Sequence, residues 1–468
     1  MMRTHLLLPL GAVALTAACS DAPRLTSPPP ATATRAVDPT WWTRFDHPRE
    51  RFVAIGTSIS MGWASNGVYD KSQLVSWPSL LEFASGTPMS LPLIQSPGCT
   101  SPLIAPLGAG KRLSGESAAG STVCAPNDIG VTLPTQNLAL AGAIAADALQ
   151  KTSEEGVATG SPWYARVLPP GTTQLSAALA QQPTFVSVEL GGNDVLGALS
   201  GLFAPGITVV PFPFFAAPYG AILDALGTAH PKALLFEMPS EARNLPAIRG
   251  GNEVWADRLE FAALNVDVST DCNGSPNYIN VSIKSLELVF TAAFTSTHGL
   301  PNPVFSCADI PGTADLVLTP ADIAAVNAEL AQMRAFVEQQ AASRGYAVAS
   351  LGALYDMPNL KPPTYSVISQ LTSPFPFGPF ISLDGVHPSI FGHAVLAFEA
   401  ARAINTRYGH AGDEVVRATG PSTSFLEPPG VPDERVGSAL ELARRIAREH
   451  QGLRLSACSI ALSCNVRR

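Results

Sequence analysis

Charged side chains are scarce in this chain of 468 residues: Asp, Glu, Lys and Arg together make up 14% of it, whereas an average soluble domain has about 25%. The 37 acidic residues outnumber the 29 basic ones, and no run of Lys or Arg is long enough to follow a phosphate backbone. We therefore expect no nucleic-acid partner. Apolar residues make up 46% of the chain, which excludes disorder as a description of the whole.

Metal-ligand spacing is also absent. None of the seven cysteines lies in a CxxC pair, and the eight histidines form neither an HxH nor an HExxH pattern. The sequence therefore predicts no metal and no other cofactor.

The first eighteen residues predict an export signal. Arg3 supplies a positive end, and the apolar run over 6–18 is too short to span a bilayer. Small residues precede Cys19, and this resembles the lipobox of bacterial lipoproteins, in which that Cys carries the lipid, although Thr16 stands where Leu is usual. We expect a signal peptide over 1–18, a lipidated Cys19 anchored to a membrane of the cell envelope, and a Pro-rich tether over 19–48. An ordinary secretory signal is the alternative.

Six further cysteines in an exported chain predict disulfides. Six cysteines allow fifteen pairings. Pairing between neighbours in the sequence gives Cys99 with Cys124, Cys272 with Cys307, and Cys458 with Cys464.

Strand-like apolar segments alternate with helical ones from residue 51 onward, which predicts a parallel sheet with crossover helices. The strands are expected at 52–55, 185–190, 233–237 and 346–351. The clearest helix starts after Thr319, an N-cap followed by Pro320, and stops at Gly345.

Four short motifs lie close to the predicted strands or near the end of this α/β region. A serine at the carboxyl end of a strand stands where open α/β sheets place their sites. The motifs are Gly56-Thr57-Ser58, the segment 137–142 ending in Gly142, Gly191-Gly192-Asn193-Asp194, and Asp384-Gly385-Val386-His387-Pro388.

In this order the four motifs resemble those of the SGNH hydrolases, also called GDSL esterases and lipases. The resemblance covers roughly residues 50–405 and implies a three-layer α/β sandwich with a flavodoxin-like parallel sheet. It implies Ser58 as nucleophile, Asp384 and His387 as its triad partners, and Gly142 and Asn193 in an oxyanion hole with the backbone amide of Ser58. Thr57 departs from the pattern, because the family usually has Asp there.

These residue types suit acyl transfer by themselves. A serine hydroxyl becomes a strong nucleophile when a neutral imidazole takes its proton and a carboxylate holds the imidazole in the correct tautomer. We expect a carboxylic ester hydrolase acting on small-molecule or lipid esters through an acyl-serine. Two alternatives stay open: a carbohydrate O-acetyl esterase or O-acyltransferase that uses the same residues, and a non-catalytic surface lipoprotein that keeps only the fold. His393 is a rival for the base, but we expect it to be a core or surface residue.

Residues 195–223 contain no charged side chain but include four prolines, which argue against a membrane span and against a regular helix. We expect an irregular insertion, over about 195–230, packed against the site. Phe214 and Phe215 would form an acyl-chain wall there, or the segment would only pack the core. The hydrolase domain is expected over 49–408, with a Cys-containing insertion over about 245–315 and a C-terminal appendage over 409–468.

Overall fold

The computed structural model describes residues 51–85 and 89–409. The predicted signal peptide, lipidated Cys19, the tether, residues 410–468 of the appendage and the Cys458–Cys464 pair lie outside the described residues.

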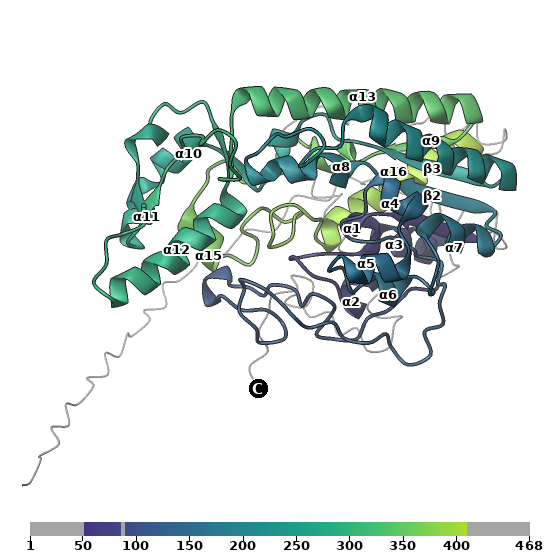
Figure 1. The fold of residues 1–468 in the computed structure, drawn as a ribbon, viewed down its shortest axis with the longest axis horizontal. Helices are drawn as coiled ribbons and strands as arrows, with labels where there is room; N and C mark the ends of the chain where they lie inside the picture. The colour runs from purple at the N-terminus through teal and green to yellow at the C-terminus, as the bar shows by residue number, and fades with distance from the viewer. Residues whose placement is uncertain (1–50, 86–88, 410–468) are drawn as a thin grey trace, which may run out of the picture. The chain divides into compact units, whose positions relative to one another are not determined.

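A four-stranded parallel sheet forms at the four segments where strands were predicted (Figure 1). In spatial order it consists of β1 (Phe52–Gly56), β2 (Phe185–Glu189), β3 (Lys232–Glu237) and β9 (Ala347–Ser350). Every residue of β1 and β2 is buried. Parallel sheets are covered on both faces, so their strands are continuously apolar rather than alternating.

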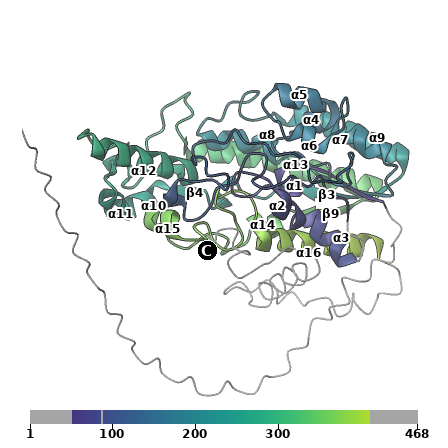
Figure 2. The ribbon, with the colours of Figure 1, turned by 90° about the horizontal axis from the view of Figure 1, so that it is seen from below.

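Helices cover both faces of this sheet, as Figure 2 shows. One layer contains α4 (Ala145–Gln150), α7 (Gln174–Ala180), α9 (Phe212–Ala229) and α13 (Pro320–Arg344). The opposite layer contains α3 (Trp77–Ser85) and α16 (Ile390–Tyr408). The fold is therefore the predicted three-layer α/β sandwich.

The predicted boundaries of α13 are confirmed. The Thr319 side chain accepts a hydrogen bond from the Asp322 amide, the Asp322 carboxylate accepts one from the Thr319 amide, and Gly345 ends the helix in the left-handed region at φ 71°. A reciprocal pair of this kind satisfies amides that the first helical turn leaves unpaired.

Shorter elements connect these layers. The remaining α-helices are α1 (Ser58–Met61), α2 (Asp70–Leu74), α5 (Ser153–Ala158), α6 (Tyr164–Val167), α8 (Gly192–Leu196), α14 (Gly352–Tyr355) and α15 (Val367–Thr372), besides those of the next paragraph. The 3-10 helices are η2 (Leu107–Ala109), η3 (Gly197–Ser200), η4 (Ala242–Asn244) and η5 (Thr270–Cys272). No helix among the described residues is long and apolar enough to cross a membrane.

The chain between β3 and α13 forms a second group of elements, which includes the predicted Cys-containing insertion. An antiparallel sheet joins β4 (Ile248–Gly250), β6 (Tyr278–Asn280) and β8 (Val317–Leu318), and a parallel pair joins β5 (Asp267–Val268) and β7 (Val304–Phe305). Its helices are α10 (Gly251–Ala256), α11 (Arg258–Ala263) and α12 (Val281–Thr297).

Two disulfides close long loops, and both join the cysteines expected to pair. Cys99 and Cys124 are bonded with a Cα–Cα distance of 3.7 Å, and Cys272 and Cys307 with 4.9 Å. The first bond crosses a region of the chain that contains little regular structure. The second lies within the group of elements between β3 and α13.

The expectation of an irregular insertion is wrong for the second half of the apolar segment. Residues Phe212–Ala229 form α9, an 18-residue helix that connects β2 to β3 across one face of the sheet. Pro211 is its N-cap and Pro213 lies in its first turn, where a missing N–H removes no helical hydrogen bond. Of the prolines in α9, Pro218 alone lies beyond the first turn, where the missing N–H removes a helical hydrogen bond. The number of prolines therefore does not exclude a helix, because the effect of each proline depends on its distance from the first residue of the helix.

We predict that Pro218→Ala stabilises the protein. A proline inside a helix is less favourable than Ala by about 3 kcal/mol, while the flexibility that Ala adds to the unfolded chain offsets up to about 1 kcal/mol. We expect a net gain of about 2–3 kcal/mol in the free energy of unfolding, measured with urea. Pro213→Ala is the matched control and should change the stability by less than about 0.5 kcal/mol. A Pro218→Ala variant no more stable than the Pro213→Ala variant would contradict the assignment of Pro218 as the destabilising proline of α9.

Candidate active site

Three neighbouring parallel segments bring the first three motifs to one end of the sheet. Residues 136–140 run beside β1, because the Ala54 amide donates to the Gln136 carbonyl and the Leu138 amide donates to the Ala54 carbonyl, both at 2.9 Å. β1 in turn pairs with β2 in parallel register. The carboxyl ends of the three segments therefore lie side by side, and Gly142, Ser58 and Asn193 follow them.

Ser58, His387 and Asp384 form a continuous hydrogen-bonded relay. Ser58 is the first residue of α1, directly after β1, and His387 and Asp384 lie in the loop before α16. The distance from His387 Nε2 to Ser58 Oγ is 2.9 Å, and the distance from His387 Nδ1 to Asp384 Oδ2 is also 2.9 Å. The structure thus brings together the three residues that the motifs predicted, across 329 residues of sequence.

Asp384 is held as an anion by its surroundings. Its carboxylate accepts hydrogen bonds from the backbone amides of Asn66, Val386 and His387, at 2.7, 3.0 and 2.8 Å. Burial alone would raise the pKa of Asp384, but attraction to the His387 ring and these hydrogen bonds outweigh burial and lower the pKa to about 2. An ionised Asp384 fixes the proton of His387 on Nδ1, which leaves Nε2 free to accept the Ser58 proton.

The predicted oxyanion donors follow the carboxyl ends of the three neighbouring segments. Ser58 begins α1, so its backbone amide has no partner within the helix. Gly142 has φ 79°, a left-handed conformation, and nothing lies within 4 Å of the place a Cβ would occupy. Asn193 Nδ2 donates to the Ala143 carbonyl at 2.9 Å, which fixes the orientation of the side-chain amide and leaves its second hydrogen available.

Asp194 provides a second attachment for the Gly142 loop. Its Oδ2 accepts from the Ala145 amide at 3.3 Å, and its backbone amide donates to the Gly191 carbonyl at 3.1 Å. The side chain is buried, and Oδ1 has no hydrogen-bond partner among the described residues. Burial raises the pKa of Asp194 to about 7. The loop that carries Gly142 is therefore tied to both residues of the Asn193-Asp194 pair.

Two tryptophans stand next to the relay, and sequence reasoning did not identify them. The Trp63 ring lies 6.5 Å from the His387 ring and packs edge to face against Trp163, with centroids 5.0 Å apart. Trp163 is half-buried and donates from Nε1 to the carbonyl of Ala141, beside Gly142. No motif marks either position, because both come from loops whose path is set by tertiary contacts.

Thr57 fits the nucleophile turn in spite of its departure from the family pattern. Its hydroxyl is buried and donates to the carboxylate of Glu189 at 2.9 Å. Glu189 is a further residue that sequence reasoning missed. The only available signal was a carboxylate at the end of a strand with no other charged residue.

His393 is buried in α16, as expected for a core residue rather than a base. Burial, with a smaller repulsion from His387, lowers the pKa of His393 to about 3. Neither ring nitrogen has a hydrogen-bond partner among the described residues. His393 therefore stays neutral.

Phe214 and Phe215 do not form one wall. Phe214 is 70% exposed on α9, whereas Phe215 is fully buried and packs against Tyr219 and Phe336, with ring centroids 5.1 and 6.2 Å apart. A ring without exposed surface cannot line a substrate pocket. For Phe215 the core-packing alternative therefore applies, and the role of Phe214 stays a prediction.

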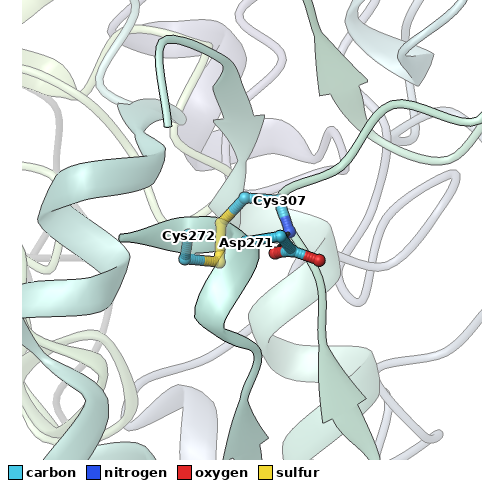
Figure 3. A group of neighbouring side chains, drawn as sticks. All are labelled: Asp271, Cys272 and Cys307. Atoms are coloured by element: carbon cyan, nitrogen blue, oxygen red, sulfur yellow. Dashed lines mark hydrogen bonds between the residues drawn. A yellow bond between two sulfur atoms is a disulfide. The ribbon is translucent and has the colours of Figure 1, made fainter. Parts of the chain in front are cut away.

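A cluster of metal-ligand side chains consists of Asp271, Cys272 and Cys307 (Figure 3). Both sulfurs are bonded to each other in the disulfide, and Asp271 accepts hydrogen bonds from the Cys307 amide and the Ser306 hydroxyl at 2.8 and 2.7 Å. Disulfide sulfur is not the thiolate that binds metals. This cluster gives no support for a metal site.

Comparison with known proteins finds similarity only among solved structures. No family model matches the chain, and no curated protein matches it. A GDSL-like lipase from Parabacteroides merdae shares 12% identity over 75% of this chain and 94% of its own, with a TM-score of 0.29. An acetylxylan esterase from Geobacillus stearothermophilus shares 13% over 77% and 95%, with a TM-score of 0.31. An extracellular lipase from Streptomyces rimosus shares 14% over 76% and 98%, with a TM-score of 0.29.

The first of these structures carries the name of the family that the four motifs resemble. Their low identities and TM-scores assign no substrate to this chain. The chemistry of the site therefore follows from its own geometry, above all from the hydrogen bonds that join Ser58, His387 and Asp384.

The raised pKa of Asp194 predicts a pH-dependent loss of stability. The unfolded carboxyl ionises near its ordinary pKa of 3.8, while the folded one ionises near about 7, so the unfolded state loses its proton first as the pH rises. The contribution of Asp194 to the free energy of unfolding should fall by at most about 4 kcal/mol between about pH 4 and pH 7. Above about pH 7 it should stay constant. Asp194→Asn should remove that dependence.

Urea unfolding at several pH values between about 4 and 8 measures the effect. The stability of the Asp194→Asn variant relative to the wild type should increase with pH up to about 7. Asp224→Asn, which changes a carboxylate that is 74% exposed on α9, is the control and should show no such trend. Parallel pH profiles for wild type and Asp194→Asn would contradict the prediction.

Proposed function

We propose that this chain is a serine hydrolase of the SGNH, or GDSL, type that cleaves carboxylic esters through an acyl-serine intermediate. The single observation that carries the proposal is the relay from Ser58 through His387 to Asp384, with both hydrogen bonds at 2.9 Å. A serine hydroxyl bonded to the free nitrogen of a carboxylate-oriented imidazole is an activated nucleophile.

In the proposed reaction, Ser58 Oγ attacks the acyl carbon and its proton passes to His387 Nε2. The carbonyl oxygen becomes an anion that the amides of Ser58 and Gly142 and the side chain of Asn193 stabilise. The imidazolium of His387, stabilised by ionised Asp384, then protonates the leaving alcohol. Water then attacks the acyl carbon and gives a proton to His387. His387 passes that proton to Ser58 Oγ as the acid leaves, which restores the free enzyme.

The state of the nucleophile turn weighs against the alternative of a non-catalytic lipoprotein. That alternative depended on Thr57 distorting the turn. Instead, the Thr57 hydroxyl donates a hydrogen bond to Glu189, and Ser58 Oγ lies within hydrogen-bond distance of His387. A protein that kept only the fold would have no need to keep this geometry.

Export and lipid anchoring through Cys19 are part of the proposal and rest on the sequence of residues 1–19 alone. The acyl group and the alcohol are open. A panel of acetyl, butyryl and octanoyl p-nitrophenyl esters, run beside an acetylated xylo-oligosaccharide, distinguishes a simple esterase or lipase from the carbohydrate esterase alternative. An added alcohol acceptor tests for acyl transfer.

We predict that Ser58→Ala lowers kcat by about a million-fold, as the loss of such a nucleophile does in other serine hydrolases. Labelling with a fluorophosphonate probe, followed by mass spectrometry of the labelled peptide, locates the reactive serine independently of the substrate. The label should fall on Ser58 in the wild type and be lost in the variant. Ordinary turnover by a folded Ser58→Ala protein would rule out the proposed mechanism.

We predict that Asn193→Ala lowers kcat by about 100- to 1000-fold with a smaller change in KM, because the amide acts on charge that develops after binding. The variant also loses the hydrogen bond to the Ala143 carbonyl, so its urea unfolding curve is measured in parallel to exclude loss of the fold. A raised KM with an unchanged kcat would place Asn193 in substrate binding instead.

A further inference from the structure

A buried carboxylate lies directly beneath the nucleophile turn. Glu189 is the last residue of β2, is completely buried, and is paired in register with Gly56, the last residue of β1. The turn that begins after Gly56 therefore passes over its side chain.

The carboxylate of Glu189 binds the turn on both sides of Ser58. Its oxygens accept from the amide and hydroxyl of Thr57, at 3.0 and 2.9 Å, and from the amide and hydroxyl of Ser60, at 3.3 and 2.9 Å. Both residues donate from backbone and side chain alike. All four groups belong to the turn itself.

These donors are neutral, and none of the ion pairs found among the described residues includes Glu189. Burial raises the pKa of Glu189, and the hydrogen bonds from Thr57 and Ser60 oppose the rise. A buried carboxylate without a cation is costly unless hydrogen bonds replace its water. The nucleophile turn supplies that replacement, so the turn and the carboxylate depend on each other.

The amides of Ser58 and Ile59, which lie between Thr57 and Ser60, are not bound by Glu189. Glu189 takes the amides at positions 57 and 60 but not the amide of Ser58, which stays available for the developing oxyanion. Ser60 is tied further, because Trp77 Nε1 donates to its hydroxyl at 3.0 Å and Asn137 Nδ2 donates to its carbonyl at 2.8 Å. The turn is thereby joined to α3 and to the segment that leads to Gly142.

We propose that Glu189 is a positioning residue for the nucleophile: through Thr57 and Ser60 it fixes the direction of Ser58 Oγ toward His387 and of the Ser58 amide toward the oxyanion. This inference rests on the proposed function. It also explains Thr57, since a hydroxyl at this position gives the buried carboxylate a donor. Gln has nearly the shape of Glu, and Val nearly that of Thr, so the hydrogen bonds can be removed with little change in packing.

The experiment compares Glu189→Gln and Thr57→Val with the conservative control Thr57→Ser. Gln presents an NH2 group where the turn needs an acceptor, and Val lacks the hydroxyl that Ser retains. Displacement of a reacting group by about 1 Å can lower a rate about 100-fold, so Glu189→Gln and Thr57→Val should each lower kcat by about 10- to 100-fold with KM changed by less than about threefold. Thr57→Ser should stay within about threefold of the wild type.

Two further readouts separate positioning from general stability. The rate of labelling of Ser58 by a small fluorophosphonate should fall in parallel with kcat. Thr57→Val leaves the buried carboxylate with one donor fewer and should have a lower urea midpoint than Thr57→Ser, so kcat is compared under conditions in which both variants are fully folded. The double variant Thr57→Val with Glu189→Gln should lose little more than the worse single variant, because both changes break the same interaction. If Glu189→Gln fails to fold, the comparison of kcat between Thr57→Val and Thr57→Ser alone tests the inference.

A folded Glu189→Gln protein with wild-type kcat, or a Thr57→Ser variant as impaired as Thr57→Val, overturns the inference while the proposed function stands. A wild-type protein that neither hydrolyses any ester of the panel nor reacts with the fluorophosphonate overturns the proposed function itself. The two failures are therefore distinguishable by the wild-type assay.

Discussion

The parallel pairing of β1 with β2 is the constraint on which the site depends. Their register sets Gly56 beside Glu189, so that the two strands end together and the turns that follow them emerge at the same edge. Successive side chains of a strand point to opposite faces, and a slip of one residue would turn the Glu189 carboxylate away from the nucleophile turn. It would also shift Asn193 relative to Ser58 by about 3.3 Å. The oxyanion site and the nucleophile are thus aligned by the backbone hydrogen bonds between β1 and β2 as well as by the side chains of the site.

Buried carboxylates in this molecule are balanced by N–H and O–H groups more than by cations, in keeping with its scarcity of charge. Asp384 accepts from three backbone amides as well as from His387, and its pKa is lowered to about 2. Asp194 accepts from one amide, has an oxygen without a partner among the described residues, and has its pKa raised to about 7 by burial. Attraction to His387, together with the larger number of donors that reach Asp384, accounts for this contrast better than depth of burial, since both groups are buried. A relay built on fixed dipoles needs no reorganisation when charge moves from Ser58 to the oxyanion.

The sequence predicted most where local chemistry decides the structure. The four strands are short segments made mainly of apolar residues, and α13 is bounded by Thr319 and Gly345, whose roles are local. The three relay residues could be named because each lies in a short motif. Prediction failed where position within an element mattered: Pro213 and Pro218 look alike in a sequence, yet the first lies in the first turn of α9 and the second lies beyond it. Glu189 was missed because its function comes from a partner on another strand, and no spacing in the chain records that pairing.

The loop that carries Asp384 and His387 is hydrogen-bonded to a strained turn that follows Ser58 and α1. Ser65 and Asn66, shortly after α1, are consecutive non-glycine residues in the left-handed region, at φ 54° and 57°. Such residues are uncommon and cost of order 1–3 kcal/mol each, so the structure must compensate for them. The compensation comes from the loop before α16: the Ser65 amide donates to Ser382 Oγ at 2.8 Å, and the Asn66 amide donates to Asp384 Oδ2 at 2.7 Å. These hydrogen bonds join residues that are 317 and 318 positions apart in the sequence. One of the two acceptors, Asp384, is the carboxylate that orients His387. The strained turn therefore adds two hydrogen bonds to the His387–Ser58 contact, and together they join the segment after β1 to the loop that carries Asp384 and His387.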